Sequence, residues 1–134
     1  MKVDSLKESF KKDNFSKLFG IELLELSNGR AKLKLPISEK LLNFFGVGHG
    51  GAIYALADVA FSLACNADDD IELAVALNSN INYIKKAKLG DILIAKAKVI
   101  STSRKTSITE IFISNQNEEL IAKFEGLAYL RRKK

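Results

Sequence analysis

The sequence has few of the residues that build disulfides, metal centres and paired-histidine catalytic sites. Its 134 residues include one cysteine, one histidine and one proline. The single cysteine, Cys65, excludes an internal disulfide and argues against a thiolate metal site, so we expect it to be a core residue. Because His49 is the only histidine, the chain alone cannot supply a mechanism or metal site that needs two histidines. We therefore predict no metal.

Long apolar runs and targeting segments are also missing. No stretch reaches the roughly 18 apolar residues that a membrane-spanning helix needs. The first residues, MKVDSLKESFKK, carry acids and resemble neither a signal peptide nor a transit sequence. No linker, internal repeat or low-complexity segment interrupts the chain. The sequence therefore predicts one domain over residues 1–134, cytoplasmic and not bound to a membrane.

The charge is unbalanced, with a net charge of +5 and a pI near 9.3. A basic chain favours anionic partners, such as nucleic acid or a phosphate-bearing cofactor or substrate. The lysines are scattered apart from RRKK at 131–134, which we interpret as a solvated tail. Aromatic and basic residues do not alternate as they do on nucleic-acid-binding surfaces. We therefore expect no nucleic-acid partner.

Apolar periodicity predicts an α+β domain. Residues 4–19 follow helical spacing, and this helix is expected to pack on the sheet through Leu6, Phe10, Phe15, Leu18 and Phe19. Strand-like runs occupy residues 21–26, 30–37, 72–84, 91–101, 106–114 and 119–130. Several of these runs have one apolar face, as in antiparallel sheets. Residues 50–65 form a helix that is apolar nearly all round, so the sheet or a partner chain must wrap it.

That central helix carries one charge in its middle, Asp58. Burying a lone carboxylate costs several kcal/mol unless it is paired or its pKa rises. One interpretation is a carboxylate bonded to backbone donors or to a lysine at a subunit contact. The other interpretation is a catalytic group.

The start of the helix is rich in glycine, since Gly48, Gly50 and Gly51 surround His49. Free backbone N–H groups at a helix N-terminus can bind an anion or form an oxyanion hole, although glycines also permit close packing and His49 could be a simple cap. Asp58 follows Gly50 by eight residues, which is about 12 Å along a helix. The two can act on one substrate atom only if Asp58 comes from a second copy of the chain, as a two-fold dimer would allow.

The segment NFFGVGHGGAIYALADVAFSLAC, residues 43–65, resembles the signature of hotdog-fold thioesterases of the phenylacetic-acid-degradation (PaaI-like) type. That signature contains an Asn, a glycine loop, His-Gly-Gly, and an Asp eight residues after the first glycine of that pair. The resemblance implies a hotdog fold, in which a curved antiparallel sheet wraps a long helix, here with an extra N-terminal helix. It also implies a homodimer, commonly within a dimer of dimers, and hydrolysis of acyl-coenzyme A (acyl-CoA) thioesters.

The resemblance implies a role for each matching residue. The Gly50 N–H would polarise the thioester carbonyl, His49 would hold the loop or the carbonyl, and Asn43 would place substrate or water. Asp58 of the neighbouring chain would be the general base or the nucleophile. Gly51 would lie at the substrate. This chemistry needs no cofactor, because coenzyme A is part of the substrate.

Other positions are assigned less directly. The CoA phosphates need cations, and the candidates, expected as a group near the site rim, are Lys85, Lys86, Lys88, Arg104 and Lys105. Phe44 and Phe45 could line the acyl pocket or pack in the core.

One position departs from the family pattern. Some relatives have a Ser or Thr on the strand after the helix, where Ala76 aligns here. Ser79, three residues on, is expected on the opposite side of a regular strand.

Two alternatives share the fold. One is a non-catalytic acyl-CoA-binding or sensor protein, which would not need the acid at position 58. The other is a hotdog dehydratase, whose usual pairing of histidine and acid has a different local pattern. The sequence leaves open the acyl group, whether aryl-acetyl, short-chain or medium-chain, and the tetramer arrangement.

Overall fold

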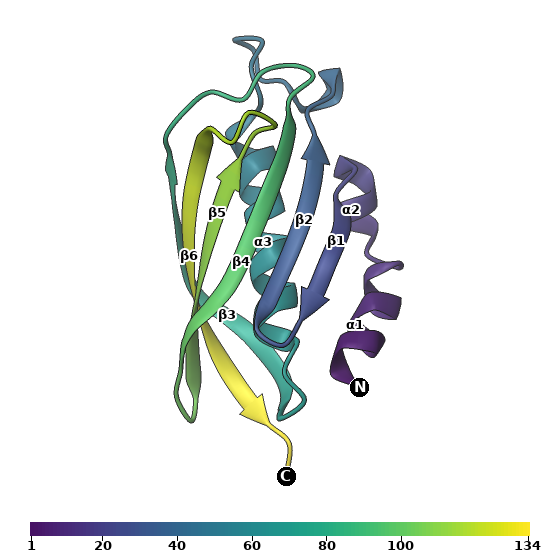
Figure 1. The fold of residues 1–134 in the computed structure, drawn as a ribbon, viewed down its shortest axis with the longest axis vertical. Coiled ribbons are helices and arrows are strands. Elements are labelled where there is room, and N and C mark those ends of the chain that lie inside the picture. Colours follow the sequence, from purple (N-terminus) through teal and green to yellow (C-terminus); the bar gives the residue numbers. More distant parts are fainter.

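The computed structural model describes all 134 residues and places a six-stranded antiparallel sheet around one long helix (Figure 1). The elements in chain order are α1 (Lys2–Phe10), α2 (Asn14–Phe19), β1 (Glu22–Ser27), β2 (Arg30–Pro36), the short 3-10 helix η1 (Glu39–Leu41), α3 (Gly50–Asn66), β3 (Ile71–Tyr83), β4 (Ile92–Thr102), β5 (Thr106–Ser114) and β6 (Leu120–Arg132). The predicted α+β class and central helix are confirmed, as are the two strands before that helix and the four after it. No helix of the chain is long and apolar enough to cross a membrane.

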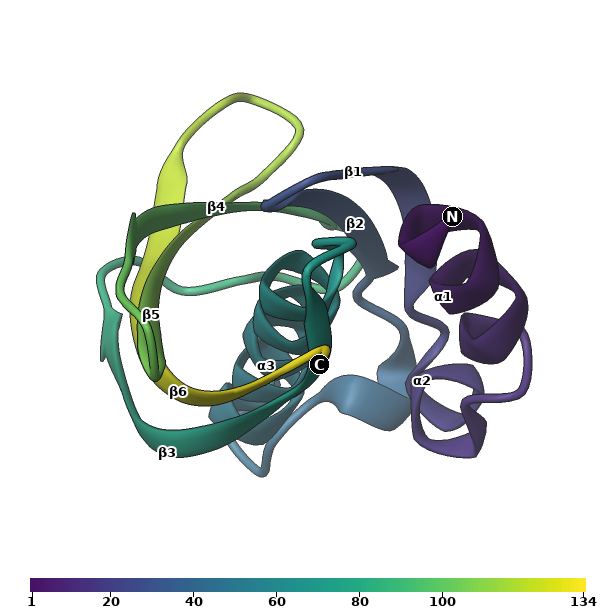
Figure 2. The same cartoon turned by 90° about the horizontal axis from the view of Figure 1, so that it is seen from below.

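The strands are arranged in the order β1-β2-β4-β5-β6-β3. Viewed along α3, the sheet curves around the helix, and α1 and α2 lie beside it near β1 (Figure 2). The long strand β3 pairs only with β6, so its other side is a free edge of the sheet. This edge carries three exposed apolar side chains, Leu73, Val75 and Leu77.

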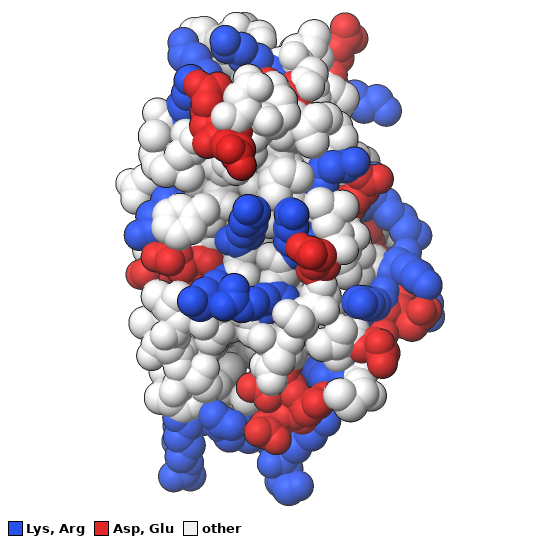
Figure 3. All heavy atoms as spheres, in the orientation of Figure 1, with Lys and Arg blue, Asp and Glu red and all other residues white.

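Alternation along the strands sets the two faces of the sheet. In β2, Leu33 and Leu35 are fully buried against α3, whereas Lys32 and Lys34 point outward. Lys34 pairs with Glu22 on β1 at 3.2 Å. The outer face therefore mixes Lys and Arg with acidic side chains (Figure 3). The inner face and α3 supply most of one buried cluster of 31 residues.

The N-terminal segment differs from the single helix predicted over residues 4–19. It forms two helices, because Asp13 adopts an extended conformation, accepts a hydrogen bond from the Ser16 N–H at 3.3 Å and so caps a new helix. The predicted apolar face is also partly wrong. Leu18 is 76% exposed and Phe15 is 50% exposed, while Leu6, Phe10 and Phe19 pack against the core.

Gly126 on β6 marks the closest approach between the sheet and α3. A Cβ atom at this position would lie 2.6 Å from the Phe61 ring. The ring is itself 98% buried and in contact with Phe124. The absence of a side chain at Gly126 therefore lets the sheet close over the helix.

We expect Gly126→Ala to lower the free energy of unfolding by about 1–3 kcal/mol, as overpacking of a core does. Phe61→Leu in the same chain should recover part of this loss, because the smaller side chain makes room for the methyl group. Chemical denaturation of the two single variants and the double variant measures the coupling. Additive losses would contradict this contact.

Candidate active site

The N-terminus of α3 presents one unpaired backbone amide. The Gly48 N–H donates to the Ala87 carbonyl and the His49 N–H to the Leu41 carbonyl, both at 2.7 Å. The Gly51 N–H donates to His49 Nδ1 at 2.8 Å. The Gly50 N–H has no acceptor within the chain. Because the helix dipole favours negative charge there, Gly50 is the amide able to bind a developing oxyanion.

His49 caps α3 and keeps a second polar atom free. Since Nδ1 accepts the Gly51 N–H, the proton of the neutral ring lies on Nε2. His49 is exposed, so Nε2–H can donate to a ligand beside Gly50. The predicted role of His49 in holding the loop corresponds to this cap.

A groove beside Gly50 brings together residues from three segments. Val47 and Gly48 come from the loop before α3, Gly50 and Ile53 from α3, and Lys85 and Lys86 from the chain after β3. The groove thus joins the unpaired amide to two of the predicted phosphate-binding lysines. Lys85 also forms an ion pair with Glu119, whereas Lys86 forms none within the chain.

Tyr83 is a residue of this groove that the sequence analysis missed. Its hydroxyl donates to the Gly50 carbonyl at 2.9 Å. Burial raises the pKa of Tyr83, which keeps this donor protonated. The only signal in the sequence was a hydroxyl-bearing residue at the end of a strand, two positions before a lysine pair.

Asp58 has no hydrogen-bond or ion-pair partner in the chain. Burial raises the pKa of its carboxyl group. The structural interpretation of Asp58 needs a backbone donor or a lysine beside the carboxylate. The same chain supplies neither, so this interpretation holds only if a partner chain supplies one. The structure leaves a half-buried carboxylate with its oxygens available, which is the condition of a general base or a nucleophile.

Asp58 lies on the one side of α3 that the chain leaves open. Gly51, Tyr54, Asp58 and Ser62 recur at helical spacing, and each is partly or fully exposed, whereas most of α3 is buried. Tyr54 of this stripe contacts Ser79 of β3, and Asp58 and Ser62 line a hollow together with Phe15 of α2. Along one helix, Gly50 and Asp58 are separated by about 12 Å. The two groups therefore belong to one site only across two chains.

The structure corrects the prediction for Ser79. A bulge between Ala76 and Asn78 shifts the strand by one residue, so that Ala76 and Ser79 face the same side, opposite Ala128 and Gly126 of β6. The Ser79 hydroxyl reaches inward to the Tyr54 hydroxyl, one helical turn before Asp58. Ser79 thus lies on the face of β3 that meets α3.

The loop before α3 places three predicted residues. Asn43 Oδ1 accepts the N–H groups of Phe45 at 3.0 Å and Val47 at 3.2 Å, which leaves its Nδ2 free to contact a substrate. Phe44 and Phe45 stack on one another, with ring centroids 4.4 Å apart. They are 91% and 77% exposed, so core packing within the chain is excluded for both.

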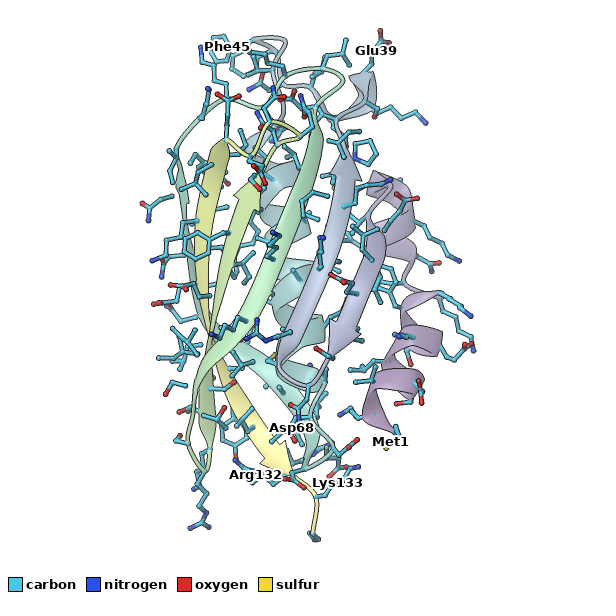
Figure 4. All side chains as sticks on the ribbon, in the orientation of Figure 1. Met1, Glu39, Phe45, Asp68, Arg132 and Lys133 are labelled. Atoms are coloured by element: carbon cyan, nitrogen blue, oxygen red, sulfur yellow. The ribbon has the colours of Figure 1, made fainter.

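Not all predicted cations gather at the groove. Figure 4 shows Phe45 at one end of the molecule and Arg132 at the other. Arg132 donates to the Arg104 carbonyl at 2.9 Å, which places the β4–β5 turn with Arg104 and Lys105 at the end opposite Gly50. The prediction that all these cations gather at the site rim is therefore wrong within one chain. The strand β4 separates Arg104 and Lys105 from the lysines that follow β3. Lys88, near Lys85 in sequence, does not line the groove.

Cys65 is buried near the end of α3, and its Sγ lies 3.6 Å from the Ser62 carbonyl. Burial raises the pKa of this thiol to about 12, so it is not a thiolate nucleophile at neutral pH. No group of three His, Cys, Asp or Glu side chains is arranged to hold a metal ion.

Comparison with known proteins relates this geometry to enzymes. The thioesterase superfamily model matches residues 45–122. The acyl-coenzyme A thioesterase PaaI of Escherichia coli is 31% identical over 90% of this chain and 84% of its own length. An Archaeoglobus fulgidus protein, provisionally named an esterase, is 36% identical over 90% of this chain and 77% of its own length.

Solved structures agree with the sequence matches. The E. coli PaaI structure superposes with a TM-score of 0.90 at 28% identity, covering 97% of this chain and 94% of that one. A hypothetical thioesterase of Streptococcus pneumoniae, solved with coenzyme A, gives a TM-score of 0.79 at 25% identity, covering 85% of this chain and 90% of that one. The predicted hotdog fold is confirmed.

The unpaired carboxylate predicts a pH-dependent cost in stability. Because burial raises the pKa of Asp58 in the folded chain, the folded state loses stability as the pH rises through that pKa. We expect Asp58→Asn to melt at a higher temperature than the wild type at pH 7 and to show no such gain near pH 3. Scanning calorimetry at both pH values tests this, with the exposed Glu39→Gln as control. A wild type as stable as Asp58→Asn at pH 7 would contradict it.

Proposed function

We propose that this chain, which belongs to the thioesterase superfamily, hydrolyses acyl-CoA thioesters at sites shared between two copies. One observation carries the proposal: α3 bears both an unpaired N–H at Gly50 and an unpaired carboxylate at Asp58, too far apart to meet. A thioester needs little more than an oxyanion hole and one base or nucleophile. The relative named acyl-coenzyme A thioesterase and the relative solved with coenzyme A support this substrate class.

The free edge of β3 supports the pairing of two chains. A long edge strand with exposed apolar side chains exposes unpaired backbone groups that another strand can bind. The open stripe of α3 lies next to β3, because its Tyr54 hydroxyl contacts the Ser79 hydroxyl of that strand. A two-fold dimer through β3 would continue the sheet and set the two stripes against one another, which brings Asp58 of each chain toward the other chain's Gly50.

The proposed reaction starts with the carbonyl oxygen of the thioester on the Gly50 N–H of one chain. His49 Nε2–H of that chain donates to the same oxygen. Asp58 of the other chain takes a proton from water, whose oxygen attacks the carbonyl carbon. The tetrahedral intermediate then expels the CoA thiolate, which leaves as the thiol with the proton from Asp58. Direct attack by Asp58, through an anhydride that water then hydrolyses, uses the same groups.

The lysines of the groove define where coenzyme A would lie. Lys85 and Lys86 flank the same groove as Gly50, so phosphates bound there would place the thioester near the unpaired amide. Lys86 is the stronger candidate, because Lys85 already pairs with Glu119.

The first test is release of CoA thiol from a panel of acyl-CoA esters. We expect Asp58→Asn to lower kcat/KM at least about a hundredfold, as loss of a general base does. The acid limb of the wild-type pH profile should lie above the usual range of aspartate, because the pKa is raised and only the ionised form acts. Binding of every ester without turnover by the wild type would favour the sensor alternative.

The second test isolates the Gly50 amide. Gly50 is the first residue of α3 and follows an extended His49 (φ −66°, ψ 131°), where proline fits the backbone. Proline removes the N–H and adds a Cβ at the same place as alanine does. We expect Gly50→Pro to lower kcat about 10²–10³-fold. Gly50→Ala keeps the N–H and adds a Cβ 3.3 Å from Tyr83. Equal losses in both variants would contradict the role of the amide.

Mixing the two inactive variants tests whether the site is shared. A dimer of one Asp58→Asn chain and one Gly50→Pro chain holds one intact site if the two groups come from different chains. Refolding a 1:1 mixture should then restore about a quarter of the wild-type rate, since half of the dimers are mixed and half of their sites are intact. No recovery, with mixed dimers present by mass spectrometry, would overturn the shared site.

A further inference from the structure

A second cavity lies at the end of the molecule opposite the Gly50 groove. Its walls come from the C-terminal end of α3, the turn between β1 and β2, and the adjoining ends of the other strands. We call it the α3 C-terminal cavity. Asp68, one of its residues, lies at the end of the molecule away from Phe45 (Figure 4). No residue of the open stripe of α3 lines it, so the cavity lies apart from the face through which two chains would pair.

The inner part of the cavity is apolar. Ala64, Ile71, Val99 and Leu130 line it, and three of these four side chains are almost fully buried. The volume of the cavity is about 280 Å³. An apolar protein cavity of about 150 Å³ holds benzene. The α3 C-terminal cavity therefore has room for a ring or a branched chain together with a few polar atoms.

A buried hydroxyl in this cavity lacks a partner. Ser107, near the start of β5, lines the cavity and is only 3% exposed. Its Oγ forms no hydrogen bond within the chain. Buried hydroxyl groups in native proteins are nearly always paired, because an unpaired one has lost its water without compensation. A polar ligand in the cavity would supply the missing partner.

Two unpaired cations stand on the sheet side of the cavity. Arg30 of β2 and Lys98 of β4 both line it, and they are direct partners in the antiparallel ladder. Like charges placed opposite one another in this way destabilise a sheet. Neither side chain forms an ion pair within the chain. An anionic group held between the two would relieve their repulsion.

The helix side of the cavity has the opposite charge. Asp68 follows α3 and uses only Oδ1, which accepts the Asp70 N–H at 2.8 Å. The last turn of α3 contains no basic residue, so the negative end of the helix dipole is not neutralised there. Lys2 Nζ donates to the carbonyls of Ile71 at 2.7 Å and Glu72 at 2.9 Å and forms no ion pair with Asp68. This side therefore favours a positive group.

We propose that the α3 C-terminal cavity binds a small zwitterion, an amino acid with an apolar side chain. Its carboxylate lies between Arg30 and Lys98, its ammonium group donates to Asp68 and to Ser107 Oγ, and its side chain packs on the apolar wall. A simple anion would meet the charge of Asp68, and a simple cation would meet Arg30 and Lys98. This site is independent of the thioesterase reaction.

The experiment is isothermal titration calorimetry of the full chain with L-leucine and L-phenylalanine. Three analogues of L-leucine each lack one feature: 4-methylpentanoate lacks the ammonium group, 3-methylbutylamine lacks the carboxylate, and glycine lacks the side chain. We expect L-leucine to have a Kd at least about tenfold lower than each analogue, because one hydrogen bond to a charged group contributes that much. Bound L-leucine should also raise Tm, since it binds only the folded chain.

Two charge variants with matched controls locate the ligand. Arg30→Gln and Asp68→Asn should each raise the Kd of L-leucine at least about tenfold. Lys32→Gln, two residues further along β2, and Asp69→Asn remove the same charges outside the cavity and should leave the Kd unchanged. Circular dichroism verifies folding, and the Asp68 pair decides if Arg30→Gln does not fold.

The buried hydroxyls give a test that a purely structural role would fail. Thr109, two residues after Ser107 on β5, is also fully buried with an unpaired hydroxyl, but it does not line the cavity. Ser107→Ala and Thr109→Val both remove an unpaired polar atom, so neither should lower Tm without ligand. Only Ser107→Ala should weaken the binding of L-leucine.

Each outcome decides the proposal without measuring turnover, so the proposed function stands or falls separately. Weaker binding in the cavity variants than in their controls supports the site. Absence of binding by both amino acids overturns it. Binding that the cavity variants leave unchanged overturns the location, and 4-methylpentanoate or 3-methylbutylamine binding as tightly as L-leucine overturns the assignment of a zwitterion.

Discussion

The structure depends on one helix that has to be both the core of the domain and the carrier of the site. The sheet wraps α3 so closely that Gly126 must lack a side chain where it meets Phe61. Only the stripe with Gly51, Tyr54, Asp58 and Ser62 stays open. Because a helix rises about 1.5 Å per residue, the amide at its start and the carboxylate in its middle cannot converge in one chain. Catalysis with both groups therefore requires a second copy, and dimerisation becomes part of the proposed chemistry.

The position of Asp58 on the same helix explains why its carboxylate lowers the stability of the fold and is also suited to act as a base. Asp58 has no donor from its own chain, and burial raises its pKa. A partner that neutralised it with a lysine would remove the cost in stability, but it would also remove the basicity. Gly50 is the complementary case, since the cap by His49 and the carbonyls of Ala87 and Leu41 satisfy the neighbouring amides and leave this one free. An unpaired hydrogen-bond donor at Gly50 and an unpaired acceptor at Asp58 thus remain, and a thioester could use both.

Local patterns in the sequence were sufficient for the strands, the central helix, the unpaired amide at the start of that helix and the cap at His49, because apolar periodicity and helix-end chemistry act over a few residues. The errors arose where a single residue or a distant contact decides the geometry. Asp13 starts a new helix inside an apolar periodicity that continues past it. The bulge at Ala76/Asn78 reverses the expected side of Ser79. The bond from Tyr83 to Gly50 joins residues 33 positions apart, and no local pattern reports it.

The residues around Asp58 come from two parts of the chain. The groups that would act on the carbonyl lie on α3, inside the segment shared with the superfamily. The apolar wall beside Asp58 comes largely from α1 and α2, which lie before that segment and contact α3 through side chains rather than through the sheet. Substitutions in these helices can reshape the hollow without moving Gly50 or breaking a strand pair. The surroundings of Asp58 can therefore vary while the central helix, held on nearly every side, keeps its sequence.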